Sequence, residues 1–349
     1  MKQYLILQYP GHNRVYYNLA DRLALSELHL AVERFSVTCT NLEIVLLKGV
    51  RYLSFTAEHA LSSDDFAILH RLSFVFALFE LKKVEDKEML LPLDRVAYEY
   101  LDAKISSLLK YPGKTNELFT KMMINVALLS SNFSFSDPIT LLDPVAGRGT
   151  TLYAASVYGF SSYGIELDPK SAHESALFFK QYLQTEKIKH KQEKKQVAGS
   201  SRSDATYMEH FQYAKNKIEA AQPSTAKKLG LVCGDTKEAA RYFKSEQFHL
   251  IVGDLPYGIF HGNGGKKTGK SKTRNPSALI TDCLAGWKKV LKKGGCIVLA
   301  WNSFLVSRME LATLFEQNGY GVLHSAPYDG FEHMVDRSIK RDIIVAKKI

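Results

Sequence analysis

Short apolar runs and one helical pattern predict the fold of the first 105 residues. Apolar stretches over residues 4–7, 42–47 and 72–81 have the length and the boundaries typical of strands. Residues 17–35 carry large apolar side chains at helical spacing, and Ser62-Ser63-Asp64-Asp65 predicts the capped start of a short helix. We therefore expect residues 1–105 to form a small α+β domain.

From residue 106 onwards, strand patterns and helix patterns alternate. The expected strands cover residues 140–142, 162–165, 229–233, 248–252, 296–301, 321–324 and 342–346. The expected helices cover residues 117–130, 151–158, 169–183, 276–291 and 308–317. Strands separated by helices indicate βαβ units, so we expect residues 106–349 to form a doubly wound α/β domain with a mostly parallel sheet.

Two polar segments interrupt this alternation. Residues 185–228 are rich in lysine around Gly199-Ser200-Ser201, which is typical of either a solvated insertion or an arm that contacts RNA. Residues 262–276 form a glycine-rich loop with five basic residues and no acid: Lys266, Lys267, Lys270, Lys272 and Arg274. Because this loop closely follows an acidic and aromatic motif at residues 254–258, we expect it to bind phosphate groups.

Charge and composition narrow the class of protein. The 349 residues include 46 Lys and Arg against 36 Asp and Glu, a formal charge of +10 that favours a polyanionic partner. The four cysteines are scattered and the histidines lack metal-ligand spacing, so we expect neither disulfides nor a metal site. No run approaches the roughly 20 apolar residues of a membrane span, and we expect a cytoplasmic protein without membrane association.

The stretch Asp254-Leu255-Pro256-Tyr257-Gly258 follows an apolar run that reads as a buried strand. A carboxylate accepts hydrogen bonds from an exocyclic amine, a proline stiffens the turn, and a tyrosine ring offers a face on which a base stacks. The pentapeptide alone also fits an ordinary strand-ending turn. Its chemical meaning therefore depends on the strand ends that precede it.

Acidic residues follow three earlier strands in order. The turn Asp143-Pro144-Val145-Ala146-Gly147-Arg148-Gly149-Thr150 brings glycines and a helix N-terminus next to a strand end. Glu166 ends the next strand, where a carboxylate can accept from both hydroxyls of a ribose. Asp235 follows the third strand, where it can accept from an adenine amino group. Together these positions predict a site for a nucleoside with an amino-acid tail, S-adenosylmethionine (SAM).

Residues 111–349 resemble the class I SAM-dependent methyltransferases that methylate amines, which carry Asp/Asn-Pro-Pro-Tyr/Phe after the fourth strand. Leu255 stands where that motif has its first proline. Within this group the chain resembles the THUMP-associated tRNA guanosine-N2 methyltransferases, some of which have Asp-Leu-Pro-Phe-Gly followed by a basic loop. The resemblance implies a Rossmann-like class I methyltransferase sheet whose last strand is antiparallel. Over residues 1–105 it is much weaker, although the family implies an RNA-binding module there.

The resemblance also assigns roles to residues. It implies that Asp143, Ala146, Gly147, Gly149 and Thr150 hold the methionine part of SAM, together with Thr115 and Asn116 from the stretch Tyr111-Pro112-Gly113-Lys114-Thr115-Asn116. Glu166 would hold the ribose and Asp235 the adenine. Asp254 would orient the guanine amino group beside the cofactor, with Pro256 and Tyr257 completing the catalytic motif. The family further implies tRNA or another RNA as partner, and a small activator subunit by analogy.

Three other functions fit part of the pattern. An adenine-N6 methyltransferase acting on DNA or rRNA uses the same arrangement on a flipped base. Enzymes with this motif order usually carry a target-recognition domain after the sheet, whereas here the additional domain is N-terminal, which favours RNA. Methylation of a protein glutamine leaves the basic loop unexplained. A non-enzymatic RNA-binding protein leaves the four strand-end carboxylates unexplained.

Overall fold

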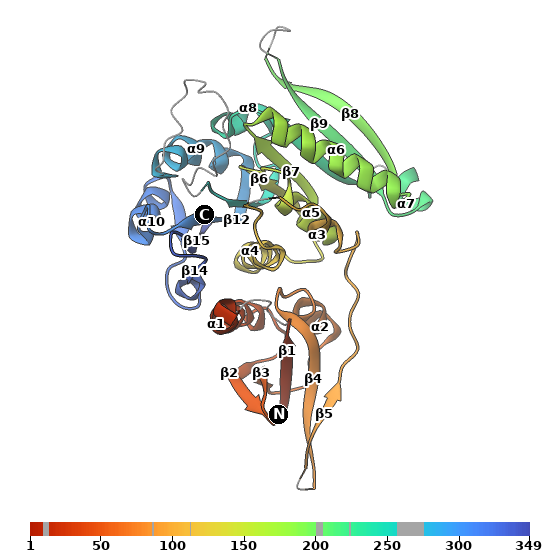
Figure 1. Cartoon of the computed structure of the whole chain (residues 1–349), viewed down its shortest axis with the longest axis vertical. Helices are drawn as coiled ribbons and strands as arrows, with labels where there is room; N and C mark the ends of the chain where they lie inside the picture. Colours follow the sequence, from red (N-terminus) through yellow and green to blue (C-terminus); the bar gives the residue numbers. More distant parts are fainter. Residues whose placement is uncertain (10–13, 86, 112, 200–204, 223–224, 257–275) are drawn as a thin grey trace.

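The computed structural model describes residues 1–9, 14–85, 87–111, 113–199, 205–222, 225–256 and 276–349. Its N-terminal module contains an antiparallel sheet in the order β2-β3-β1-β4-β5, with two helices packed on one face (Figure 1). The elements are β1 (Lys2–Gln8), α1 (Arg14–Val32), β2 (Cys39–Leu47), β3 (Val50–Ala57), α2 (Ser63–Leu69), β4 (Val75–Val84) and β5 (Lys87–Pro92).

This module has the α+β composition that the sequence predicts, with differences in detail. Ser62 caps α2 in a capping box with Asp65, as expected. The prediction missed β3 and β5, and it placed the start of β4 at residue 72, three residues early. Strand β3 mixes polar and apolar residues, yet Leu53 and Phe55 are fully buried because the strand lies inside the sheet between β1 and β2.

The remaining chain builds a second, larger sheet. Its strands are β6 (Thr140–Asp143), β7 (Ser161–Glu166), β8 (Lys189–Ala198), β9 (Thr206–Ala214), β10 (Lys227–Cys233), β11 (Phe248–Asp254), β12 (Leu291–Asn302), β13 (Tyr320–Val322), β14 (His333–Met334) and β15 (Lys340–Lys348). Its helices are α3 (Ile105–Leu108), α4 (Glu117–Ser130), α5 (Thr150–Val157), α6 (Pro169–Thr185), α7 (Lys217–Ala221), α8 (Ala239–Tyr242), α9 (Pro276–Val290) and α10 (Arg308–Gln317), with 3₁₀ turns η1 (Thr236–Glu238) and η2 (Tyr328–Phe331).

The strand order of this sheet is β13-β15-β12-β11-β6-β7-β10-β9-β8. Strands β12, β11, β6, β7 and β10 are parallel, and β15 is antiparallel to β12. From β6 the chain proceeds through β7 to β10 on one side and through β11 to β12 on the other, so the order reverses between β6 and β11. The doubly wound, mostly parallel sheet with an antiparallel last strand is thereby confirmed.

Helices cover both faces of the large sheet. Helices α4, α5 and α6 lie on one face, where α4 buries Phe119, Met123 and Val126. Helices α8, α9 and α10 cover the other face, where Trp287 of α9 is fully buried. Neighbouring residues of β6 point to opposite faces, since Leu141 packs with α4 and Leu142 packs with α9. No helix within the described ranges combines the length and hydropathy needed to span a membrane.

The segment 185–228 is more regular than either sequence-based interpretation assumed. Strands β8 and β9 form an antiparallel hairpin, and β9 pairs with β10, so the large sheet continues into this segment (Figure 1). Phe211 and Tyr213 of β9 are buried against α6 and α5. The sequence did not predict these strands because β8 is polar and almost entirely exposed, and only β9 contributes side chains to the core. We call β8 and β9 the basic hairpin.

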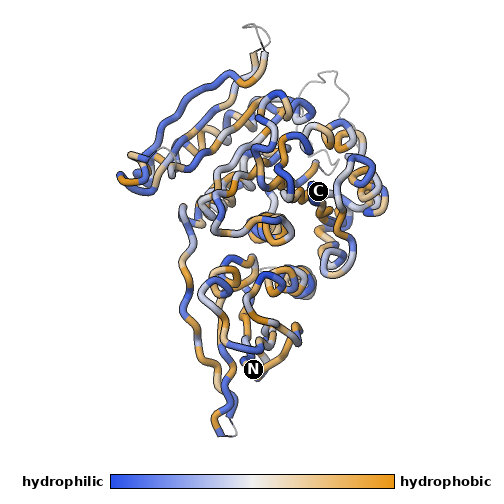
Figure 2. The backbone as a smooth tube through the Cα atoms, turned by 180° about the vertical axis from the view of Figure 1, so that it is seen from behind, coloured by the Kyte–Doolittle hydropathy of each residue, from blue (hydrophilic) through white to orange (hydrophobic). Residues whose placement is uncertain are grey.

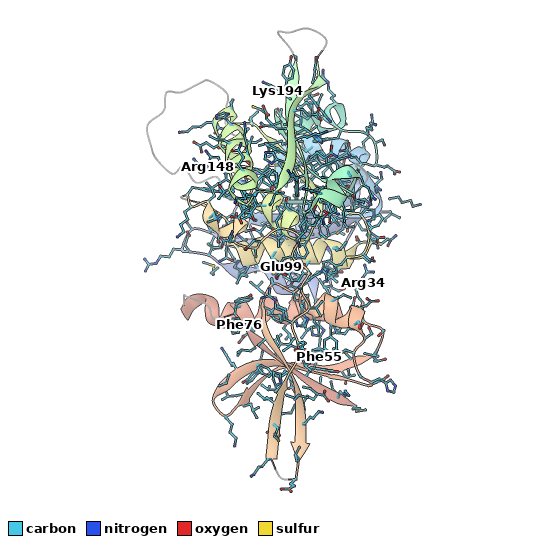
Figure 3. The ribbon with its side chains drawn as sticks, turned by 90° about the vertical axis from the view of Figure 1, so that its right-hand side faces the viewer. Arg34, Phe55, Phe76, Glu99, Arg148 and Lys194 are labelled. Carbon is cyan, nitrogen blue, oxygen red and sulfur yellow. The ribbon has the colours of Figure 1, made fainter. Side chains whose placement is uncertain are left out.

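The two modules are joined through α4. Glu27 of α1 is fully buried and accepts from Asn125 Nδ2 of α4 at 2.6 Å and from the Ser73 backbone N–H at 3.0 Å. Asn125 also donates to the Arg71 carbonyl at 2.8 Å. Arg34 lies at this junction in Figure 3 and donates to the Leu129 carbonyl at 2.9 Å. The same helix α4 begins next to Asp254, so the junction and the candidate site share one rigid element.

Candidate active site

The carboxylates predicted from the sequence lie at the carboxyl ends of neighbouring parallel strands. Asp143 ends β6 opposite Gly164 of β7, Glu166 ends β7 opposite Cys233 of β10, and Asp254 ends β11. This edge is where open α/β sheets bind ligands, and the order reverses between β6 and β11. The fold therefore brings together Asp143, Glu166, Asp235 and Asp254 on one side of the sheet.

The turn after β6 is tied to the neighbouring strand by its backbone. The Gly147 N–H donates to Glu166 Oε2 at 2.8 Å, and the Ala146 N–H donates to the Ile165 carbonyl at 2.9 Å. Gly147 and Gly149 have positive φ angles of 51° and 90°, which favour glycine. A Cβ at Gly149 would lie 2.6 Å from Ser175 Oγ, whereas a Cβ at Gly147 would enter open space. Gly149 is therefore required for close packing against Ser175 and Tyr153, whereas the space beside Gly147 is open.

Glu166 is held in place by two backbone donors. Besides Gly147, the Asp168 N–H donates to Glu166 Oε1 at 2.7 Å. Burial raises the pKa of Glu166 despite these hydrogen bonds. The next residue, Leu167, is 68% exposed, which leaves a large apolar side chain on the rim of the site. Sequence reasoning missed Leu167, although an apolar residue directly after Glu166, the residue predicted to bind a ribose, is a signal that could have indicated it.

Asp143 is a buried carboxyl group with acidic neighbours. Burial, together with the charges of Asp254 and Glu166, raises the pKa of Asp143 to about 7, although a hydrogen bond from the Val145 N–H at 3.0 Å acts in the opposite direction. The site therefore concentrates negative charge, which a cationic ligand would stabilise.

Asp254 is oriented by residues from two distant segments. Thr115 Oγ1 donates to Asp254 Oδ2 at 2.6 Å, and Arg341 Nη2 lies 3.8 Å from the same oxygen. Leu255 is buried and its N–H donates to the Ala300 carbonyl of β12 at 2.9 Å. A proline at this position would lack that donor, so Leu255 extends the pairing of β11 with β12. Pro256 follows with an exposed ring.

Arg341 is a member of the site that sequence reasoning missed. It lies on β15, is 6% exposed, and its guanidinium carbon lies 4.5 Å from the centre of the Phe119 ring. Phe119 in turn contacts His333, with ring centres 5.3 Å apart. The only signal in the sequence was an arginine at the start of an apolar strand. Its proximity to Asp254 can be recognised only once β15 is known to pair with β12.

The segment before α4 lies along the turn after β6. Tyr111 and Thr150 share a hydrogen bond of 3.0 Å between their hydroxyls, and the Arg148 guanidinium carbon lies 4.9 Å from the centre of the Tyr111 ring. Asn116 caps α4 by accepting from the Leu118 and Phe119 N–H groups. Asp235 similarly accepts from the Lys237 N–H at 3.0 Å and caps η1. The cofactor roles assigned to Asn116 and Asp235 stay predictions.

Several predicted residues lie outside the described residues: Tyr257, Gly258, Lys266, Lys267, Lys270, Lys272 and Arg274. Within the described residues, no group of three or more His, Cys, Asp or Glu side chains is arranged to hold a metal ion.

No model of a known protein family matches the sequence, and no curated protein matches it. Solved structures with a similar arrangement include TehB from Haemophilus influenzae, with 12% identity over 61% of this chain and 59% of that chain and a TM-score of 0.35. An rRNA methylase from Streptococcus thermophilus shares 10% identity over 66% and 95% of the two chains, with a TM-score of 0.35. A candidate RNA methyltransferase from Pyrococcus horikoshii shares 12% identity over 70% and 92%, with a TM-score of 0.40. The fold assignment rests on the strand order of this chain.

Proposed function

We propose that this protein is a SAM-dependent RNA methyltransferase that methylates N2 of guanosine in tRNA. The observation that carries the proposal is the position of Asp254. Its carboxylate stands at the end of β11, is oriented by Thr115 and Arg341, and lies at the same sheet edge as Asp143 and Glu166. A carboxylate in this position can accept a hydrogen bond from a substrate amine and hold that amine beside a nucleoside cofactor bound at the same edge.

The charges of the site fit SAM. The cofactor carries a sulfonium and an ammonium group, and the site offers the buried carboxyl group of Asp143 beside the half-buried carboxyl groups of Glu166 and Asp254. The open space beside Gly147 leaves room for the amino-acid tail. In this proposal Asp143, Gly147 and Thr150 hold the methionine part, Glu166 the ribose and Asp235 the adenine, with Leu167 against the base.

SAM supplies a methyl group that is already activated by its sulfonium, so alignment of the amine provides most of the catalysis. An ionised Asp254 can accept a hydrogen bond from the exocyclic amine but cannot donate one. Thr115 donates to Oδ2 and Arg341 lies near the same oxygen, so both contacts restrict the rotation of the carboxylate. Asp254 would then direct the amine lone pair toward the methyl carbon. The N–C bond would form as the sulfonium C–S bond breaks to leave a neutral thioether, and the amine proton would pass late to the Asp254 carboxylate.

Several features support RNA as the substrate. The exposed rings of Tyr9 and Phe76 lie 5.2 Å apart on the N-terminal sheet, where bases can stack, and Figure 3 shows Phe76 on this module. The formal charge of +10 suits a polyanion. The assignment of residues 1–105 as an RNA-binding module, the cytoplasmic location and the activator subunit belong to the same proposal.

The test is transfer of a labelled methyl group from SAM to purified tRNA, rRNA, DNA and protein. We expect label in tRNA, and digestion to nucleosides followed by mass spectrometry should identify N2-methylguanosine. Label in DNA or protein alone would overturn the proposal, and methylated adenosine in RNA would overturn the choice of base.

A further inference from the structure

We infer that the basic hairpin is a docking surface for the phosphate backbone of the RNA substrate, on nucleotides several positions away from the methylated base. The inference rests on the proposed function and adds to it a second RNA contact. It follows from the distribution of charge, from the register of the hairpin and from a cavity beside it.

The excess of basic over acidic residues comes from two segments of the chain. Residues 185–228 contain ten basic and five acidic residues, and residues 262–276 contain five basic residues and no acid. These two segments account for the whole formal charge of +10, so the remaining residues are neutral in sum. A merely basic protein would spread this charge over its surface. The concentration instead indicates specific contacts with a polyanion.

The register of the hairpin places part of this charge level with the candidate active site. Lys195 of β8 is opposite Met208 of β9, and Met208 is opposite Val232 of β10. Val232 is directly followed by Cys233, which pairs with Glu166. Lys194 and Lys195 are therefore level with the carboxyl ends of the parallel strands, the edge of the sheet at which Asp254 lies.

The lysines of β8 face solvent. Lys189, Lys191, Lys194 and Lys195 are all exposed, and the outer strand of the hairpin is the long hydrophilic stretch at the upper left of Figure 2. Lys195 pairs with Glu193 at 2.7 Å, but both side chains are exposed, so the pair is weak and a phosphate can replace it. Lys194 Nζ lies 4.9 Å from the centre of the Tyr207 ring, and Figure 3 shows Lys194 near the far end of the hairpin.

A cavity of about 380 Å³ lies between the hairpin and α6 at this level. Lys194, Tyr207 and Glu209 line it from the hairpin, and His173 and Cys233 line it from α6 and β10. A cation stacked on an aromatic ring beside a hollow offers both a charge for phosphate and a face for a base.

The spacing fits one continuous RNA strand. Five strand spacings of about 4.8 Å separate β11 from β8, which gives about 24 Å between Asp254 and the lysines. Stacked nucleotides advance about 3.4 Å per phosphate along a strand, so about seven nucleotides bridge the two positions. The hairpin should therefore contact RNA about seven nucleotides from the target base.

The experiment compares the triple variant K191A/K194A/K195A with the wild type. RNA binding is measured by fluorescence anisotropy with labelled tRNA over a range of KCl concentrations, and methyl transfer is measured in parallel. We expect the slope of log K against log salt to fall by about 2, because each phosphate contact contributes roughly 0.7–0.9. The KM for tRNA should rise about tenfold or more, with kcat and SAM affinity unchanged.

The matched control is K244A/K289A/K293A, which removes three exposed lysines near the amino ends of β11 and β12, at the sheet edge opposite the candidate active site and outside the N-terminal module. Both variants lower the net charge equally and leave buried residues untouched. If the two variants show the same salt slope, the hairpin is only a solvated surface and the inference fails. A wild type that binds tRNA through the hairpin but transfers no methyl group would instead refute the proposed function alone.

Discussion

The Thr115 hydroxyl donates a hydrogen bond of 2.6 Å to Asp254 Oδ2, and this contact joins the start of helix α4 to the end of strand β11. The two residues are 139 positions apart in the chain. Because α4 also carries the junction with the N-terminal module, the contact connects the candidate catalytic carboxylate to the part of the fold that places the two modules. Thr115 therefore positions Asp254, a role in addition to the cofactor binding that the family resemblance implied.

Replacement of Thr115 by valine should slow methyl transfer. Valine keeps the shape of threonine but removes the donor, so Asp254 loses the hydroxyl hydrogen bond to Oδ2. A small misplacement of a catalytic group can lower a rate by about 100-fold. We therefore expect the kcat of T115V to fall by roughly 10- to 100-fold. Steady-state kinetics with tRNA and SAM measure this loss.

Thr115→Ser is the matched control because it retains the hydroxyl, and it should keep kcat within about threefold. If T115V instead leaves kcat intact and raises the Kd for SAM, Thr115 acts on the cofactor as the resemblance implied. That result would remove Thr115 from the orientation of Asp254.

Asp254→Ala should abolish methyl transfer while the protein still binds SAM. The variant removes the acceptor that aligns the amine, a change for which we expect a loss of at least about 100-fold in kcat. Asp254→Asn keeps one acceptor oxygen of the same size, so it should retain more activity than D254A. Isothermal titration with SAM and single-turnover transfer assays separate binding from chemistry.

SAM affinity should depend on pH through Asp143. The pKa of this carboxyl lies near 7 in the folded protein, against roughly 3.9 in an unfolded chain. Between these values the folded protein holds a proton that the unfolded chain has lost, so the contribution of Asp143 to stability falls as pH rises from about 4 to about 7. A cationic ligand favours the ionised form, so SAM binding should release this proton.

Consequently, the affinity for SAM should rise with pH by up to about tenfold per unit below pH ~7 and then level off. Calorimetry in buffers of different ionisation enthalpy measures the released proton directly. In Asp143→Asn the group cannot ionise, and both the proton release and this pH dependence should disappear. An unchanged pH dependence in D143N would show that another group is responsible.

Much of the larger α/β domain could be predicted because its local patterns agree with its fold. Helices α4 and α10 have the bounds expected from their apolar spacing, and the strand ends Asp143, Glu166 and Asp254 follow short buried runs. Parallel strands place such residues at one edge without further information. The amino-acid sequence alone was therefore enough to predict that these three carboxylates lie at a common edge of the sheet.

Other features depend on contacts that a local pattern does not contain. Strand β8 is polar on both faces and exists because it pairs with β9, which pairs with β10. Arg341 reaches Asp254 only because β15 runs antiparallel beside β12. Leu255 in the motif likewise reflects tertiary structure, since its buried side chain and its bond to the Ala300 carbonyl favour leucine over proline.

Asn125→Ala should destabilise the junction between the modules. Asn125 donates to Glu27 at 2.6 Å and to the Arg71 carbonyl at 2.8 Å, and it accepts from the Tyr158 hydroxyl at 2.5 Å. Burial raises the pKa of Glu27, and the loss of a donor leaves this buried carboxyl less well satisfied. An unsatisfied buried polar group costs about 1–3 kcal/mol, and we expect the free energy of unfolding to fall by this amount.

Chemical denaturation measures the change, with Gln184→Ala as the control because Gln184 is an exposed amide on α6. The control should change the free energy of unfolding by less than about 0.5 kcal/mol. Since α4 carries Asn125 at the junction and begins beside Asp254, N125A should also lower kcat more than it lowers SAM affinity. A variant that is destabilised but keeps full kcat would show that the junction supports the fold without orienting the site.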